Sequence, residues 1–97
     1  MTFFLEVVSQ NKHIFSKDVI KIYVLGSAGE LCIYPGHSQL LTYIKSGPLY
    51  ILDSLKKENF FYLSGGILEI QPNFVTILSD DANSISKKNV LKHFFKR

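Results

Sequence analysis

Cysteine is almost absent from this sequence, tryptophan is missing, and proline occurs only three times. With Cys32 as the single thiol, the chain cannot close an internal disulfide or supply a cysteine-only metal cage, so a reducing compartment is expected. No apolar run approaches the roughly 18 residues of a membrane span, and the first residues lack the pattern of a secretory signal or transit peptide. These absences favour a folded, soluble protein.

Acidic residues are missing from the last part of the chain. Residues 85–97 carry five basic side chains and no acid, whereas residues 1–84 have a net charge of −2. A nucleic-acid-binding domain would spread Lys and Arg over one face together with stacking aromatics, so no nucleic-acid partner is expected. We interpret the basic set as the exposed face of a helix, with contact to an acidic surface as the alternative; it comprises Lys87, Lys88, Lys92, Lys96 and Arg97.

Convergent groups suited to catalysis are also lacking. His13, His37 and His93 are far apart and have no metal-ligand spacing. The pair Gly65-Gly66 is not followed by the Lys-Ser/Thr of a phosphate-binding loop, and Cys32 has no neighbouring base in the sequence that would activate it as a nucleophile. We therefore expect no catalytic residue, no metal site and no cofactor.

The 97 residues suffice for one small domain, and 46% of them are hydrophobic. From Thr2 to Leu78 the apolar residues alternate in short runs broken by Gly, Pro, Asn, Asp or Ser, a pattern that predicts an all-β sandwich or barrel. In Val19–Leu25, the alternation assigns Ile20, Ile22 and Val24 to the core face. The nine candidate strands are Phe3–Val8, Ile14–Phe15, Val19–Leu25, Glu30–Tyr34, Leu40–Ile44, Leu49–Leu52, Phe60–Leu63, Ile67–Gln71 and Phe74–Leu78.

Residues that favour tight reversals separate most of these runs. Pro35-Gly36 fits the two central positions of a type II turn. Turns are predicted at Gly26–Gly29, Tyr34–His37, Ser46–Pro48, Lys56–Asn59 and Pro72–Asn73.

The periodicity changes after Ser79–Ser84. Val90, Leu91, Phe94 and Phe95 share one helical face, so one short helix is predicted over residues 85–97, after a sandwich domain over residues 1–84. A helix this short needs a packing partner. That partner is the sandwich itself or, alternatively, a membrane or another protein.

Three motifs carry a resemblance to a known family. The runs Gly29–Thr42, Ile44–Gly47 and Tyr62–Pro72, supported by Leu5–Ser9 and Val75–Asp80 in the same order, closely resemble the epsilon subunit of the bacterial F-type ATP synthase. The resemblance covers roughly residues 3 to 82. It implies a ten-stranded β-sandwich that acts as a non-catalytic rotor part at the foot of the central stalk, on the cytoplasmic face of the bacterial inner membrane.

The partners implied by the resemblance are the gamma subunit and the membrane ring of c subunits. The catalytic alpha/beta head would be reached only indirectly, and the membrane only through the complex. The implied c-ring contacts are Ser27, Ala28, Gly29 and Glu30. The implied gamma contacts are Ser9, His37, Gln39, Thr42, Ser64 and Glu69.

The sequence also departs from the family. Members usually continue into a C-terminal helical hairpin that in some bacteria binds ATP or inhibits rotation, whereas this chain ends at Arg97, and Ala82-Asn83-Ser84 differs from the usual continuation. Inhibition and ATP binding are therefore not expected. One alternative is a brake that acts through the basic tail. Another is a free β-sandwich that binds a peptide or carbohydrate, suggested by Tyr34, Tyr43, Tyr50 and Tyr62.

Overall fold

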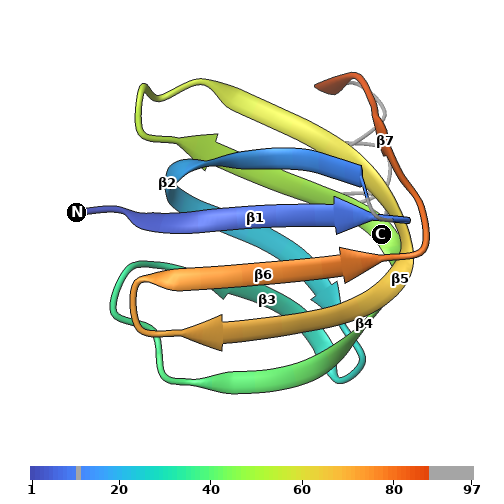
Figure 1. Cartoon of the computed structure of the whole chain (residues 1–97), viewed down its shortest axis with the longest axis horizontal. Coiled ribbons are helices and arrows are strands. Elements are labelled where there is room, and N and C mark those ends of the chain that lie inside the picture. The colour runs from blue at the N-terminus through green and yellow to red at the C-terminus, as the bar shows by residue number, and fades with distance from the viewer. Residues whose placement is uncertain (11, 88–97) are drawn as a thin grey trace.

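The computed structural model of the chain describes residues 1–10 and 12–87. These residues form seven strands, which confirms the all-β prediction (Figure 1). No helix within them is long and apolar enough to cross a membrane. The strands are β1 (Phe3–Ser9), β2 (Lys12–Gly26), β3 (Gly29–Ile33), β4 (Leu40–Asp53), β5 (Glu58–Gln71), β6 (Phe74–Ser79) and β7 (Ala82–Ser84).

Three long strands link the two layers of the sandwich. In the first layer, β1 lies between the N-terminal half of β2 and a parallel β6, and the C-terminal half of β5 and the start of β4 follow. In the second, the order is β3, the C-terminal half of β2, the rest of β4, the first half of β5, and β7. Counting both halves of β2, β4 and β5 gives ten strand segments in the described residues, five in each layer, so the expected ten strands appear as seven continuous ones (Figure 1).

One of the turns predicted from the sequence is part of a long strand. Ser46–Pro48 lies inside β4, where Ser46, Gly47 and Pro48 pair with Ser64, Leu63 and Tyr62 without a shift in register. The predicted turn is therefore wrong. Gly66, with φ of 142°, lets β5 pass so close to β6 that an added Cβ would lie 2.0 Å from the Leu78 carbonyl oxygen.

A bulge in β2 corrects the predicted core face. Val19 pairs with Asp53, but the next pair is Lys21 with Leu52, so an extra residue shifts the alternation. As a result Val19, Ile22 and Val24 are buried, whereas Ile20, which was expected in the core, is only half-buried.

Aliphatic side chains from both layers fill the core. Leu5 and Val7 of β1 alternate with outward-facing neighbours, and the inward positions of the other strands add to them. The most deeply buried side chains are Leu5, Val7, Val19, Ile22, Val24, Ile33, Leu49, Ile51, Leu63, Leu68, Val75 and Ile77.

The remaining turns agree with the sequence in most cases. The His37 N–H donates to the Tyr34 carbonyl at 3.3 Å with Gly36 at φ 81°, as a type II turn requires. The Pro72–Asn73 and Gly26–Gly29 turns are also present. The turn predicted at Lys56–Asn59 instead spans Asp53 to Lys57, because the Asp53 side chain caps it.

The end of the described chain adds a short strand that the sequence did not indicate. In β7, Ala82 pairs with Leu63 and Ser84 with Phe61. The helix predicted over residues 85–97 lies almost entirely outside the described residues, so that helix and the domain boundary at residue 84 stay predictions.

Candidate interaction surface

The outer side of the first layer carries three rows of side chains, which we call the three-row face. Each row crosses neighbouring strands in register. The first row is Tyr43, Ile67, Leu78 and Val8; the second is Leu41, Glu69, Thr76 and Glu6; the third is Gln71, Phe74 and Phe4.

Apolar side chains on this face are unusually exposed. Tyr43 is 71% exposed, Leu41 70% and Leu78 49%. One face of an antiparallel sheet normally meets water with polar side chains, and the inward positions of these strands already supply the core. Contiguous exposed apolar surface is typical of a protein-binding site.

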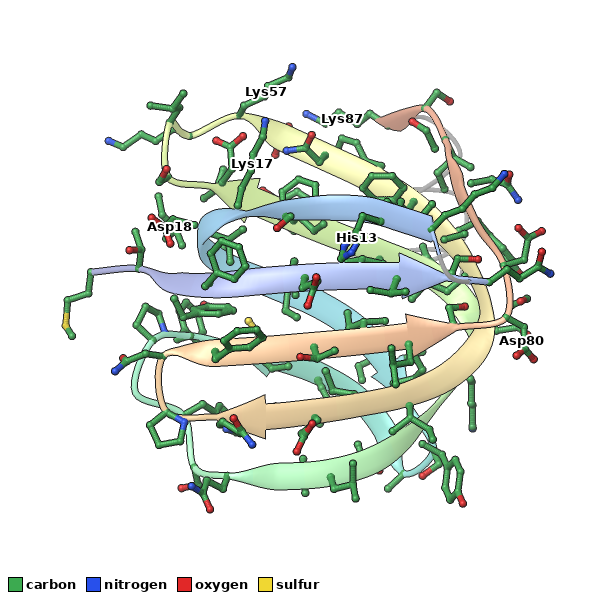
Figure 2. All side chains as sticks on the ribbon, viewed as in Figure 1. His13, Lys17, Asp18, Lys57, Asp80 and Lys87 are labelled. Atoms are coloured by element: carbon green, nitrogen blue, oxygen red, sulfur yellow. The ribbon has the colours of Figure 1, made fainter. Side chains whose placement is uncertain are left out.

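Two carboxylates lie in the middle row, between the two apolar rows. The Oε2 atom of Glu6 is 2.9 Å from Nδ1 of His13, which is seen on β2 beside β1 in Figure 2. The Nε2 of Gln71 donates to Oε2 of Glu69 at 3.2 Å. Both carboxylates are thus held on the face by polar neighbours from the face or its edge.

The expected c-ring contacts form the turn between β2 and β3. The Ser27 N–H donates to the Tyr43 carbonyl at 3.0 Å, which joins this turn to the first row of the three-row face. Beneath the turn is an open hollow of about 320 Å³, lined by Leu25, Gly26, Gly29, Glu30 and Lys45. The turn is exposed throughout Ser27–Glu30.

Three of the expected gamma contacts lie at or beside the three-row face. Glu69 is in its middle row, opposite Leu41. His37 and Gln39 are exposed in the loop that enters β4 just before Leu41. The structure therefore brings these three positions to one region of the surface.

The other three expected gamma contacts lie elsewhere. Ser9 is 5% exposed, and its hydroxyl donates to the Asp80 carbonyl at 3.2 Å, so this side chain faces the interior. Ser64 is exposed, but its N–H donates to Asp81 O near the link to β7. Thr42 is half-buried and alternates with the outward-facing Leu41 and Tyr43.

Sequence reasoning missed most of the apolar rows. Leu41, Ile67 and Leu78 read as ordinary strand residues, because the sequence does not show which strands lie side by side. A usable signal was present, since β4, β5 and β6 carry large apolar residues at both inward and outward positions.

The outer side of the second layer carries an aromatic cluster. Tyr50 packs against Tyr23 and Phe60, with ring centroids 5.7 and 5.4 Å apart. Its hydroxyl donates to Oε2 of Glu58 at 2.9 Å. Burial, followed by this interaction with Glu58, raises the pKa of Tyr50 to about 12. Because Tyr43 lies on the first layer and Tyr50 on the second, the tyrosines suggested for a ligand groove do not line one surface.

No candidate metal site is found in the part of the chain that the structure describes. Within residues 1–10 and 12–87, no three His, Cys, Asp or Glu side chains converge as metal ligands would. The three-row face and the adjoining Ser27–Glu30 turn are both suited to protein contact.

The chain is similar to known subunits of ATP synthases. The family model for the ATP synthase delta/epsilon chain β-sandwich domain matches residues 2–85. A chain of the Euglena gracilis mitochondrial ATP synthase (OSCP/F1/c-ring, rotational state 1) superposes with a TM-score of 0.82 at 21% identity, covering 94% of this chain and 60% of that one. A chain from the central stalk and c-ring of the Tetrahymena thermophila enzyme gives 0.71 at 18% identity, covering 84% and 66%. This chain therefore spans less than two thirds of the length of each of these two chains.

Proposed function

Because the chain belongs to the delta/epsilon β-sandwich family of ATP synthase subunits, we propose that it is a non-catalytic central-stalk subunit that couples the gamma subunit to the membrane c-ring. The three-row face carries this proposal. It offers exposed apolar side chains for a permanent partner, and it adjoins a separate polar turn that suits a second partner.

In this proposal the gamma subunit covers the three-row face, and His37, Gln39 and Glu69 lie within or beside the contact. A stable contact of this kind buries on the order of 1,000 Å² or more, and its centre is richer in aromatic and apolar side chains than its rim. Leu41, Tyr43 and Leu78 would supply such a centre.

The Ser27–Glu30 turn would contact the c-ring. Because the Ser27 N–H donates to the Tyr43 carbonyl at the end of the first row, the two proposed contact surfaces would lie side by side. Ser27, Ala28 and Gly29 are small, so neighbouring backbone can approach closely, and Glu30 and Lys45 at the hollow offer one charge of each sign.

Torque passes through such a part only if the part resists deformation. β2, β4 and β5 each belong to both layers, so the layers are joined covalently as well as by the packed core. The sandwich would thus move as one body between gamma and the c-ring, with no reaction of its own.

Location follows from the partners in this proposal. The subunit would be held at the membrane by the complex, and placement on the cytoplasmic face of a bacterial inner membrane stays a prediction, since the two solved relatives named above are mitochondrial.

Co-purification from membranes tests the proposal. A double variant, Leu41→Asp with Tyr43→Asp, puts two charges on exposed positions of the three-row face, so we expect it to be lost from a complex isolated through gamma, with a matching loss of ATP synthesis. Leu55→Asp, at an 87% exposed residue in the turn after β4, is the control and should stay bound. Retention of the double variant at wild-type levels would contradict the proposal.

A further inference from the structure

The two carboxylates of the three-row face indicate which charges a partner of this face would carry. Glu6 and Glu69 both lie beside Thr76, one on β1 and the other on β5, so they are two strand spacings apart. This separation is about 10 Å between their Cα atoms. Apolar rows flank the pair on both sides, with Leu78 in one row and Phe74 in the other.

A partner that covers the apolar rows must also cover these carboxylates. Taking a carboxylate out of water without a charged partner carries a large free-energy penalty. The polar neighbours of the two carboxylates include His13 on the outer edge beside Glu6, Gln71 beside Glu69 and Thr76 between them. Among the described residues, neither carboxylate forms an ion pair with a lysine or arginine. The cost of desolvating Glu6 and Glu69 would therefore weaken a contact that excludes water from the apolar rows, unless the partner brings positive charges to the two carboxylates.

We propose that the partner docked on the three-row face presents two basic side chains, about 10 Å apart, to Glu6 and Glu69, between two sets of apolar side chains. The inference rests on the proposed function, because it names the chemistry of the gamma surface that would seat there. It identifies Glu6 and Glu69 as the residues that set the register of the contact, while Leu41, Tyr43 and Leu78 supply its apolar area.

A helix laid across the strands meets this requirement. Residues i and i+7 of an α-helix share a face and lie about 10.5 Å apart along the axis. Arginine suits both positions better than lysine, because its planar guanidinium binds a carboxylate through two parallel hydrogen bonds. Apolar residues one turn away on that face would then meet the two apolar rows.

The two carboxylates are held in place by neighbouring side chains before any partner binds. The Glu6–His13 contact of 2.9 Å and the Gln71–Glu69 hydrogen bond restrict both side chains to the face. Groups ordered beforehand lose less conformational entropy when a partner arrives. Charge attraction would also speed the encounter, and more so at low salt.

The test compares binding of the purified chain to its gamma subunit, measured by calorimetry from about 50 mM to about 500 mM salt, a range over which surface charge is progressively screened. The variant is Glu6→Gln with Glu69→Gln, which keeps size and removes both charges. The control is Glu58→Gln with Asp80→Asn, which makes the same change in net charge at positions off the face; Asp80 is labelled in Figure 2. Circular dichroism and thermal melting check that both variants fold.

We expect the Glu6/Glu69 variant to bind about tenfold or more weakly at low salt, with a shallower salt dependence, and the control to bind like the wild type. If the wild type binds gamma but the Glu6/Glu69 variant binds equally well with an unchanged salt slope, the inference is overturned and the proposed function stands. If the control weakens as much as the variant, net charge alone is responsible, which also overturns it. If the wild type does not bind gamma at any salt concentration, the proposed function itself fails.

Discussion

Asp53 and Lys57 are joined by two hydrogen bonds across the turn that links β4 to β5. The Asp53 N–H donates to the Lys57 carbonyl at 3.0 Å, and the Lys57 N–H donates back to Oδ1 of Asp53 at 2.9 Å. The same Oδ1 accepts the Leu55 N–H at 3.0 Å, and the residue is only 2% exposed. One carboxylate therefore organises a turn in which Lys56 adopts a positive φ of 64°.

The Asp53 carboxylate makes the stability of the folded protein depend on pH in the acidic range. The hydrogen bond from the Lys57 backbone, with smaller contributions from Leu55, Asn59 and Lys17, lowers the pKa of Asp53. A depressed folded-state pKa gives stability that is present above the unfolded value, near 3.9, and is lost as pH falls through the folded value. We expect Asp53→Asn to lower the urea midpoint at pH 7, with the gap from the wild type narrowing below about pH 4.

Asp80→Asn serves as the matched control for the acid prediction, because Asp80 is an exposed aspartate at the opposite end of the molecule (Figure 2). Its urea midpoint should follow that of the wild type throughout. A gap for Asp53→Asn that stays constant down to acid pH would mean that the effect comes from turn geometry rather than from the charge.

Gly66 is predicted to be the glycine least tolerant of substitution. Its φ of 142° lies in a region that side chains rarely adopt, and a Cβ would fall 2.0 Å from the backbone oxygen of Leu78. Gly29 has a similar φ of 137° but nothing within 4 Å of its Cβ position. Substitution of Gly29 therefore measures the cost of backbone strain alone, whereas substitution of Gly66 adds a steric clash.

We expect Gly29→Ala to lower the free energy of unfolding by about 1 to 2 kcal/mol, the range for a residue held at an unfavourable φ. Gly66→Ala should lower it by about 3 kcal/mol or more, because β5 and β6 must also move apart. Urea unfolding of both variants measures the difference. Equal losses would show that the close approach to Leu78 is relieved without penalty.

Tyr50 should keep its proton well into the alkaline range. Its pKa is raised to about 12, first by burial and then by Glu58. Since the unfolded chain releases this proton near pH 10, the residue contributes stability below that value and loses it as pH rises towards 12. The tyrosinate absorbance of the wild type minus that of Tyr50→Phe should rise close to pH 12. A rise near pH 10 instead would contradict the combined effect of burial and Glu58 on the pKa of Tyr50.

Much of the fold was accessible from sequence, because alternation and turn residues are local signals. Where prediction failed, a non-local contact decided the outcome. Gly47-Pro48 looks like a turn, yet it lies at a bend of β4 because the paired strand β5 runs on beside it. Ile20 does not lie on the core face because β2 has one extra residue between Val19 and Lys21 relative to β4.

The candidate site was less accessible for the same reason. Glu69 and the Ser27–Glu30 turn were found through the family resemblance, but the middle row exists only once β1, β6 and β5 are set side by side. Ser9 shows the reverse case. Nothing local distinguishes it from an exposed serine, and its burial follows from a contact with Asp80, 71 residues away.

The parallel pairing of β1 with β6 affects how the nascent chain folds during translation. Strand β1 can pair with β2 soon after both are synthesised, but its other edge stays unpaired until Phe74–Ser79 has been synthesised. Contacts between such distant segments form slowly, and a bare apolar edge invites aggregation meanwhile. We therefore expect the sandwich to close only after β6 has been synthesised, and a chaperone would shield Phe3, Leu5 and Val7 until then.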